Sequence, residues 1–479
     1  MPAAIIYDID KEAGSGIMQQ LISKLYTINE AVSAFVWGVP MLVLFLGVGV
    51  YFTICTGGLQ FRRLRDILRA PFRSDAPGSG SISAFSAVSG ALAGTLGIGN
   101  IVGVAGAILL GGPGVVFWMV ASAFLCMILK YAETLLAVRY RTRNERGETV
   151  GGPMYYMRDG LSLRLLPAVF CLLCLATALF GAGNVTQIGT ISHAVEDTFG
   201  IGGLWVSAAC AVCILLMTGG SVKRLGNVFA ILTPLMSILF MAASLLVLLR
   251  NIQRLPEVLV LILRSAFSPR AAAGGVGAYT LLSAAKYGVS RGVFSNEAGL
   301  GSSPIIHAAS GNTPVRQGMC GAFEVFFDTV VMAGLTALTI LCSGVDLGAG
   351  MSPTALTAAA FGTVFGRASS EILTVMLVVF AVSSVPCWYF YGEKCVEYLW
   401  KRAGAKRVYR IFFFALMVFC PLLRLDGLWD LADSLNGLMA VPNLIAVVML
   451  SREVIAATQG ERGRRDAVRL LAGRTRDNI

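Results

Sequence analysis

Histidine and charged residues are scarce in this chain. Only His193 and His307 occur among its 479 residues, and Asp, Glu, Lys and Arg together make up 14% of the sequence. Two isolated histidines cannot build a histidine-rich metal centre, and they form no nucleophile–base arrangement with a serine or cysteine. We therefore expect a protein that is not an enzyme.

The chain also lacks a polar stretch long enough to fold as a separate soluble domain. Its longest non-apolar intervals are 56–84, 139–165, 250–276 and 343–370, each shorter than an ordinary domain. Hydrophobic residues make up 56% of the sequence, and the mean hydropathy is +0.74. No soluble domain buries so much apolar surface. The composition predicts an all-α polytopic membrane protein whose main partner is the lipid bilayer.

Apolar segments of about 20 residues, the length that crosses a bilayer as a helix, recur along the whole chain. Residues 1–30 precede them and lack the cationic start of a signal peptide, so we interpret them as an extracytoplasmic segment. We predict eleven transmembrane helices, near residues 31–55, 85–109, 113–138, 166–192, 203–219, 225–249, 277–308, 318–342, 371–393, 409–423 and 430–451.

The net charge of +11 does not indicate a nucleic-acid partner, because Lys and Arg gather in alternate loops. Segments 60–73, 139–164 and 394–410 and the tail 452–479 fall on one side of the predicted membrane. Basic residues mark the cytoplasmic side, so we predict an external N-terminus and a cytoplasmic C-terminus. Segment 251–275 is basic on the opposite side, and we interpret it as a helix or loop at the lipid surface.

Two apolar segments are interrupted by glycine and polar residues. The first reads GTLGIGN at 94–100, and the second reads GVSRGVFSNEAGLGSS at 288–303. Such interruptions predict helices that open near the middle of the bilayer. The backbone groups freed there are tolerated where a ligand, an ion or water binds them. Freed N–H groups favour a carboxylate, and freed carbonyls favour a cation or an ammonium group.

Glycine has a specific use at the first interruption. Gly94, Gly97 and Gly99 would permit unusual backbone angles and a close approach of a small substrate. Close helix packing through glycine is the alternative. Packing alone does not explain the neighbouring Thr95 and Asn100, so we favour a binding segment.

Several motifs together resemble the alanine/glycine:cation symporter family. They are GALAGTLGIGNIVGVAGAILLGGPGVVFWM, KYAETLLAVRYR, GGPMYYM, GNVTQ and RGVFSNEAGLGSSPIIHAA, and the likeness covers roughly residues 35 to 450. The resemblance implies a leucine-transporter-like fold with two inverted five-helix repeats. An extra N-terminal helix at 31–55 would precede repeats at 85–249 and 277–451, and the basic tail 452–479 would follow.

The same resemblance implies a function. It suggests a secondary transporter that couples inward Na⁺ movement to uptake of small neutral amino acids, alanine and/or glycine. The membrane would be the plasma membrane of a bacterium or archaeon, and no cofactor is implied beyond Na⁺ as the coupling ion. A proton-coupled carrier is the main alternative. A channel is disfavoured because polar residues cluster at one depth and form no continuous polar file.

Substrate-binding residues follow from this resemblance and from helical spacing. Asn184 and Gln187 lie three residues apart and would share a helix face, with Phe180 one turn earlier. Their amides would either join helices or, as the resemblance favours for Gln187, donate to a substrate carboxylate. The expected substrate-binding residues are Thr95, Gly97, Gly99, Asn100, Phe180, Asn184, Gln187, Phe294 and Trp388.

A sodium site is expected at two adjacent hydroxyls. Ser383 and Ser384 would combine with freed backbone carbonyls near Gly94 and Gly97, because hard oxygen ligands suit Na⁺. The alternative is ordinary serine back-bonding at the kink of Pro386. The resemblance places a sodium site of this fold at such a position.

Acidic residues inside apolar segments are functional or paired by default. Glu133 follows Lys130 by three residues, which predicts an ion pair or a tether for the unwound segment. Glu297 and its neighbour Asn296 follow the second interruption, where Glu297 would act as a structural latch or ion ligand. Asp328 would belong to a structural or gating polar network.

Overall fold

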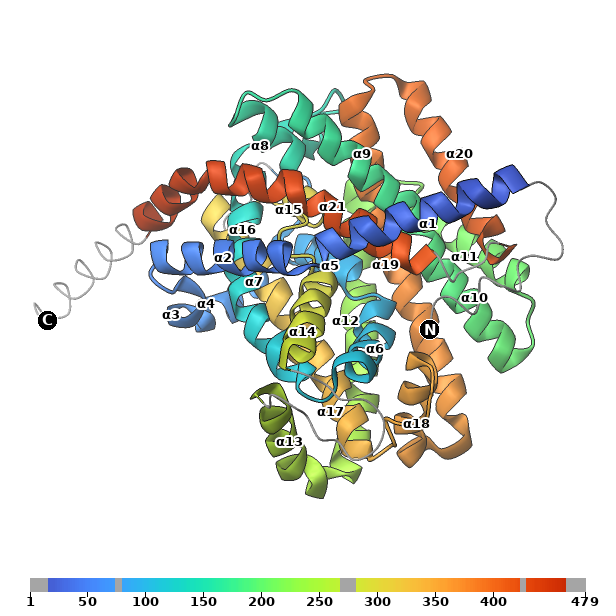
Figure 1. The fold of residues 1–479 in the computed structure, drawn as a ribbon. Helices are drawn as coiled ribbons and strands as arrows, with labels where there is room; N and C mark the ends of the chain where they lie inside the picture. The colour runs from blue at the N-terminus through green and yellow to red at the C-terminus, as the bar shows by residue number, and fades with distance from the viewer. Residues whose placement is uncertain (1–15, 74–79, 268–280, 423–427, 462–479) are drawn as a thin grey trace, which may run out of the picture.

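The chain folds into a bundle of helices. The structure, a computed structural model, describes residues 16–73, 80–267, 281–422 and 428–461. Only the short hairpin of β1 (Thr142–Arg143) and β2 (Thr149–Val150) interrupts the all-helical pattern within these ranges (Figure 1). Seven helical stretches of the described chain are long and apolar enough to cross a membrane. The predicted total of eleven stays a prediction, because some of the predicted spans consist of two shorter helices.

The first predicted span, 31–55, is preceded by more helix than expected. Helix α1 (Gly16–Val36) begins inside the segment assigned to an extracytoplasmic extension, and α2 (Val39–Cys55) continues after a short interruption at Trp37 and Gly38. Trp37 donates its indole N–H to the Asp433 carbonyl at 3.0 Å. This bond fixes the junction of α1 and α2 against α21 (Leu428–Met449), which runs beside them in Figure 1.

Both predicted helix breaks are present. At the first break, α5 (Ala84–Thr95) gives way to the 3₁₀ turn η3 (Ile98–Asn100) before α6 (Val102–Gly111) begins. At the second break, α14 (Leu281–Asn296) ends in a non-helical segment that leads to the single turn α15 (Pro304–His307). Helix α7 (Val115–Arg139) packs against α14 and α15 and supports the second break.

A third break contradicts the continuous helix expected over 166–192. The structure has α9 (Leu165–Phe180) and α10 (Val185–Phe199), separated at Gly181–Asn184. Gly183 permits a close approach there, since a Cβ atom on it would lie 2.8 Å from the Trp388 Cβ. The chain therefore leaves the helical path to pass α19 (Ser369–Leu399), which carries Trp388.

The predicted span 318–342 contains a π-helical turn. Helix α16 (Pro314–Val325) passes into the π-helical turn η5 (Phe326–Ala333) and then into α17 (Gly334–Ser343). A π turn accommodates one extra residue and is frequently found at functional sites. Asp328 and Thr329 lie in this turn.

The remaining elements surround these central helices. Helix α13 (Leu255–Phe267) occupies part of the segment predicted as a surface helix and lies at the edge of the bundle beside α17 (Figure 1). Residues 451–461 are helical after α21, whereas the arginines of the basic tail from Arg462 onwards lie outside the described residues. The other helices are α3 (Leu59–Arg62), α4 (Leu64–Arg69), α8 (Pro153–Asp159), α11 (Gly203–Thr218), α12 (Val222–Arg250), α18 (Pro353–Phe365) and α20 (Ala403–Phe419).

Apolar side chains cover the outside of the bundle as well as its core. Ile54 on α2, Ile231 on α12 and Val408 on α20 are 73%, 72% and 68% exposed. A soluble protein rarely exposes large contiguous apolar patches, whereas lipid tails are as apolar as these side chains. The surface therefore agrees with a multi-pass membrane protein.

Candidate functional site

A small cavity lies where the first helix break meets α10, α14, α19 and α21. The space open to the centre of a water molecule is about 30 Å³. Its walls combine backbone of the break with neutral side chains, aromatic rings and one acidic residue, Glu297. The lining residues are Gly94, Thr95, Gly97, Ile98, Gly99, Asn100, Ala182, Thr186, Gln187, Phe294, Ser295, Glu297, Trp388 and Asn436.

Glycine forms the floor of the cavity without the unusual backbone angles that we expected. Gly97 is extended, with φ −109° and ψ −165°, and Gly94 and Gly99 have no positive φ. A Cβ atom on Gly97 would lie 3.3 Å from the Gln187 Oε1, whereas one on Gly99 would meet only the Phe294 ring, at 3.9 Å. Close approach, rather than backbone freedom, explains Gly97.

Gln187 presents its amide oxygen to the cavity. Its Nε2 donates to the Ala182 carbonyl at 2.5 Å and to the Ser384 Oγ at 2.8 Å. Its buried Oε1 has no hydrogen-bond partner among the described residues. This orientation reverses the expected one, in which the amide N–H groups would face a substrate carboxylate. An unpaired amide oxygen suits an ammonium group instead.

Trp388 and Asn436, which also line the cavity, carry further unpaired polar atoms. The fully buried Trp388 has no acceptor for its Nε1–H within the described chain, and the Asn436 Oδ1 likewise has no donor there. Buried polar atoms rarely remain unpaired in folded proteins, so such atoms indicate a ligand or ordered water. One donor and two acceptors, counting Gln187, match the carboxylate and ammonium groups of an amino acid.

Two expected lining residues lie elsewhere. Phe180 ends α9 and packs edge-on against Phe412 of α20 at 6.2 Å between ring centroids. The Asn184 Nδ2 donates to the Phe413 carbonyl at 2.9 Å. The helix break at Gly181–Asn184 removes the shared helix face on which the expectation depended, so we correct the placement of both residues.

A polar network beside the cavity centres on the Asp328 carboxylate. Asn100 donates to its Oδ1 at 2.7 Å, and Ser295 and Thr329 donate to its Oδ2, each at 2.9 Å. Asn296 joins the network by donating to the Thr329 hydroxyl at 3.0 Å. The network links the 3₁₀ turn η3 of the first break, the end of α14 and the π-helical turn η5. Asp328 thus lies in a polar network, as predicted.

The Asp328 carboxylate is fully buried and forms no ion pair with a described residue. A buried carboxylate without a counter-ion is costly unless it binds a cation or a proton. The oxygens of Asn100, Ser295 and Thr329 that surround it are hard ligands. These groups could hold a small cation.

The two serines of the expected sodium site point in different directions. The Ser384 Oγ donates to the Gly94 carbonyl at 3.1 Å, so this hydroxyl reaches the first break as expected. The Ser383 Oγ contacts the Phe380 carbonyl and the Met236 sulfur of α12. Adjacent helical residues face about 100° apart, which separates the expected pair.

Charged residues hold the second break. The Lys130 Nζ donates to the Glu297 carbonyl at 2.9 Å and lies 3.4 Å from Glu133 and 3.5 Å from Glu324. The Glu133 carboxylate accepts from the Gly299 N–H at 3.2 Å. The side chains of Lys130, Glu133, Glu297 and Glu324 are all buried. The expected pair of Lys130 and Glu133 exists, and Glu133 also tethers the unwound backbone.

Sequence reasoning missed Glu324 and its partners. The Glu324 Oε2 lies 2.9 Å from the His307 Nε2, and the His307 Nδ1 lies 2.7 Å from the Gln317 Nε2. Glu297, the expected latch, accepts from the Ser302 hydroxyl within the same segment. The acidic residue inside the apolar run GAFEVFF was the available signal for Glu324.

A larger cleft leads towards the cavity. It has a volume of about 660 Å³ and is lined by residues of α1, α6, α14 and α21. Phe294 lines both the cleft and the cavity, and the Arg291 guanidinium lies 5.0 Å from the centre of its ring. The Phe294 side chain therefore lies between the two spaces.

Broken helices around an enclosed site, with a cleft that ends at one aromatic ring, define a secondary membrane transporter. The sequence matches the sodium:alanine symporter family over residues 22–467, and the chain belongs to this family. It is a cation-coupled amino-acid transporter and not an enzyme.

Its relatives are transporters of similar length. An uncharacterized transporter of Haemophilus influenzae is 41% identical, with 90% of this chain and 95% of the relative aligned. The sodium/alanine symporter AgcS of Methanococcus maripaludis is 39% identical over 90% and 96% of the two chains. The probable sodium/glutamine symporter GlnT of Bacillus subtilis is 37% identical over 92% and 91%.

Solved structures show the same fold. MhsT in complex with L-phenylalanine is similar with a TM-score of 0.55 at 12% identity, covering 78% of this chain and 89% of that one. A manganese transporter of Eremococcus coleocola is similar with a TM-score of 0.52 at 16% identity, covering 78% and 83%. The fold is leucine-transporter-like, as predicted, and the division into two inverted repeats stays a prediction.

Proposed function

We propose that the protein couples inward movement of Na⁺ to uptake of alanine and/or glycine by alternating access. The observation that carries this proposal is the set of unpaired polar atoms at the cavity. The Gln187 and Asn436 oxygens would accept from the substrate ammonium, and the Trp388 Nε1–H would donate to its carboxylate. Neutral side chains would thus bind both ends of a zwitterion.

The small cavity favours a small side chain. Trp388 and Phe294 enclose it, and Gly97 and Gly99 leave room at its floor. The one acidic residue of the lining, Glu297, accepts from Ser302 within its own segment. A cationic or anionic substrate side chain would therefore be buried without a free partner, at a cost of several kcal/mol. Serine is a further expected substrate, whereas leucine, lysine and glutamate are not.

Glutamine is the second candidate substrate, because a relative is named as a probable sodium/glutamine symporter. Competition by unlabelled amino acids against uptake of labelled alanine separates the candidates. We expect glycine, alanine and serine to compete. Strong competition by glutamine would make glutamine the proposed substrate instead. Strong competition by leucine or lysine would refute the proposal of a small substrate.

Two positions near the first break offer oxygens to the coupling cation. One is the Asp328 carboxylate with its hydroxyl and amide neighbours. The other is the Gly94 carbonyl with the Ser384 hydroxyl. In the alternative, a proton-coupled carrier, the Asp328 carboxylate would bind a proton in place of Na⁺.

Proteoliposomes with separately imposed gradients distinguish the two ions. We expect an inward Na⁺ gradient at constant pH to drive alanine accumulation, and a pH gradient without Na⁺ to fail. The isosteric Asp328→Asn variant should need at least about tenfold more Na⁺ for half-maximal uptake, the effect of about 1.4 kcal/mol. Accumulation driven by the pH gradient alone would favour proton coupling.

The chain is a multi-pass protein of the plasma membrane, and we place its N-terminus outside. This orientation puts the cleft that ends at Phe294 on the external side. Proteolysis or cysteine labelling of intact cells tests it. Reaction of a cysteine placed in the 139–164 loop with an impermeant reagent would show that this loop is external and that the N-terminus is cytoplasmic.

A further inference from the structure

A second cleft lies at the end of the bundle opposite to the cleft that ends at Phe294. It has a volume of about 310 Å³ and lies between the β1–β2 hairpin, α8 and the connection from α19 to α20. Six basic side chains line it against only two acidic ones, Glu145 and Glu397. The basic residues are Arg143, Arg146, Arg158, Lys401, Arg402 and Lys406.

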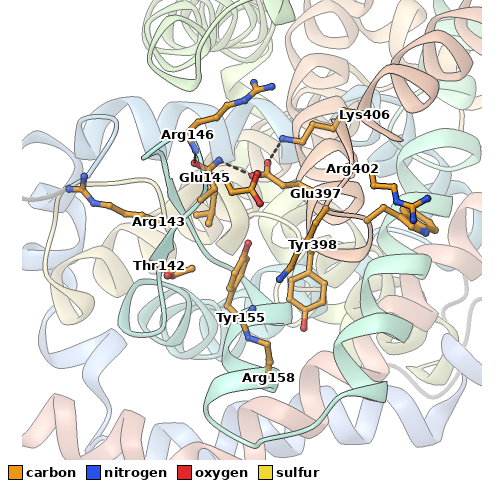
Figure 2. A pocket seen from close by; sticks show the side chains of 14 residues that line it. Thr142, Arg143, Glu145, Arg146, Tyr155, Arg158, Glu397, Tyr398, Arg402 and Lys406 are labelled. Atoms are coloured by element: carbon orange, nitrogen blue, oxygen red, sulfur yellow. Dashed lines mark hydrogen bonds and ion pairs between the residues drawn. The ribbon is translucent and has the colours of Figure 1, made fainter. Parts of the chain in front are cut away.

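The base of this cleft is a closed network of ion pairs. Glu397 accepts from the Lys406 Nζ at 2.7 Å and from the Asn144 Nδ2 at 2.8 Å (Figure 2). It also accepts from the Lys394 Nζ at 3.1 Å. Lys394 also binds Glu148 at 3.2 Å. Burial would raise the pKa of Glu148, but Lys394 and Asn144 outweigh it and lower the pKa from 4.5. The acidic groups at the base are therefore already neutralised.

The basic side chains at the rim are not neutralised. The side chains of Arg143, Arg146, Lys401 and Arg402 form no hydrogen bond or ion pair with any described residue. Figure 2 shows Arg143 and Arg402 on opposite sides of the cleft, with Arg146 beyond its acidic base. The rim therefore carries uncompensated positive charge.

Aromatic rings complete the cleft on the side away from the acidic base. The Arg158 guanidinium lies 5.1 Å from the centre of the Tyr155 ring and 5.8 Å from that of Tyr398. Trp400, which is 46% exposed, follows the end of α19. Tryptophan and tyrosine at a helix end next to basic residues mark the boundary between lipid tails and headgroups.

The adjoining helix leads directly to lipid. Val408 and Ile411 of α20 are 68% and 65% exposed, and they follow Arg402 within about three turns. An acyl chain lying on these apolar side chains would bring its headgroup to the cleft. On the orientation proposed above, this end of the bundle faces the cytoplasmic leaflet.

We infer that the cleft binds the phosphate of an anionic phospholipid headgroup. Guanidinium groups bind phosphate oxygens with paired hydrogen bonds, and basic pockets at the cytoplasmic ends of helices recognise anionic lipids. A soluble phosphate ester shares this chemistry. The lipid is favoured because the exposed apolar face of α20 continues from the rim.

The test uses the full-length protein in a neutral detergent. Its thermal unfolding midpoint is measured with added short-chain phosphatidylglycerol, with phosphatidylcholine of the same chain length, and with inorganic phosphate. We expect phosphatidylglycerol alone to raise the midpoint. The R143Q/R146Q/R402Q variant should bind it roughly 100-fold more weakly, since each basic residue near an anionic lipid contributes about 1 kcal/mol.

The matched control is the variant K223Q/R224Q, which removes exposed basic residues from the first turn of α12, on the same predicted side of the membrane. Phosphatidylglycerol should raise the unfolding midpoint of this control variant as much as it raises that of the unmodified protein. An equal response of both variants would refute the site, and equal stabilisation by inorganic phosphate would show a soluble anion instead of a lipid. Because these readouts contain no amino acid, they are independent of the proposed transport function.

Discussion

The first helix break is contacted mostly by uncharged side chains and by the Asp328 carboxylate, which forms no ion pair with a described residue, whereas buried ion pairs hold the second. Gln187, Ser384 and Trp388 contact or face the first break. At the second break, Lys130 and Glu133 hold the backbone of residues 297–299. Both breaks come from the same sequence pattern of glycine and polar residues in an apolar segment.

The two breaks differ in whether the polar atoms beside them have hydrogen-bond partners within the protein. At the first break, polar atoms of Gln187 and Trp388 stay unpaired within the described protein. At the second, the Gly299 N–H and carbonyl bind Glu133 and Asn443. One break thus leaves polar groups for a ligand, and the other is a rigid joint. The backbone agrees, because left-handed angles occur at Glu297, Gly299 and Gly301 and not at the first break.

The largest expected effect is the loss of the cation at the second break. Lys130→Met would leave the buried carboxylates of Glu133 and Glu324 without their counter-ion, at a cost of about 3–5 kcal/mol. We expect little monodisperse protein and a strongly lowered unfolding midpoint. The K130M/E324Q double variant should recover part of the loss. Normal stability of K130M would show that the second break does not depend on its charges.

A methyl group added at each break sharpens the comparison. In Gly299→Ala, the new Cβ would lie 2.8 Å from Leu129 and 2.9 Å from Phe45, at a φ of +81°. Overpacking costs about 1–3 kcal/mol, and left-handed backbone adds roughly 1–2 kcal/mol.

The matched variant is Gly99→Ala, whose Cβ would meet only Phe294 at 3.9 Å. Its stability should stay within about 0.5 kcal/mol of the unmodified protein, while uptake shifts from alanine towards glycine because the cavity is smaller. The measurements are the thermal unfolding midpoints of both variants and the uptake of glycine and of alanine by G99A. Equal destabilisation would remove the distinction between the breaks.

A smaller effect is expected where the first break meets substrate. Gln187→Leu or Trp388→Phe removes one hydrogen bond to a charged substrate group, worth about 1.5–3 kcal/mol, or roughly 10- to 150-fold in affinity. Calorimetric titration of purified protein with alanine measures this. Phe180→Leu, which alters a residue outside the cavity, should bind alanine normally. Unchanged affinity in Q187L and W388F would show that the cavity is not the substrate site.

The smallest effect separates the two adjacent serines. Ser384→Ala removes the hydrogen bond to the Gly94 carbonyl, worth about 0.5–1.5 kcal/mol, and should weaken Na⁺ activation of uptake by up to roughly tenfold. Ser383→Ala should change this activation less, because its hydroxyl faces α12. The concentration of Na⁺ at half-maximal uptake is the measurement. Equal effects would restore the sodium site predicted from the sequence.

The sequence was sufficient to predict the membrane bundle and the two breaks, because composition and unsatisfied backbone polarity constrain both strongly. The run GTLGIGN cannot continue as an ordinary lipid-exposed helix, so its position followed directly. The charge of Lys130 beside Glu133 in an apolar run likewise predicted a buried pair.

Other features depend on tertiary packing. The break at Gly181–Asn184 follows from the approach of Trp388, which lies some 200 residues away in the chain. The orientation of the Gln187 amide depends on Ser384 and Ala182, and the partners of Glu324 come from separate turns. Spacing along one segment contains no information about such contacts.

The π-helical turn Phe326–Ala333 has a consequence for how the chain tolerates a change in length. The turn holds one residue more than an α-helical turn. Removing one residue there would therefore leave α16 and α17 with the same side chains facing their neighbours. The same removal within α16 would turn every later residue of the helix by about 100°. A single deletion of Asp328 or Thr329 in this turn would therefore shorten the chain and alter the polar network at the same time.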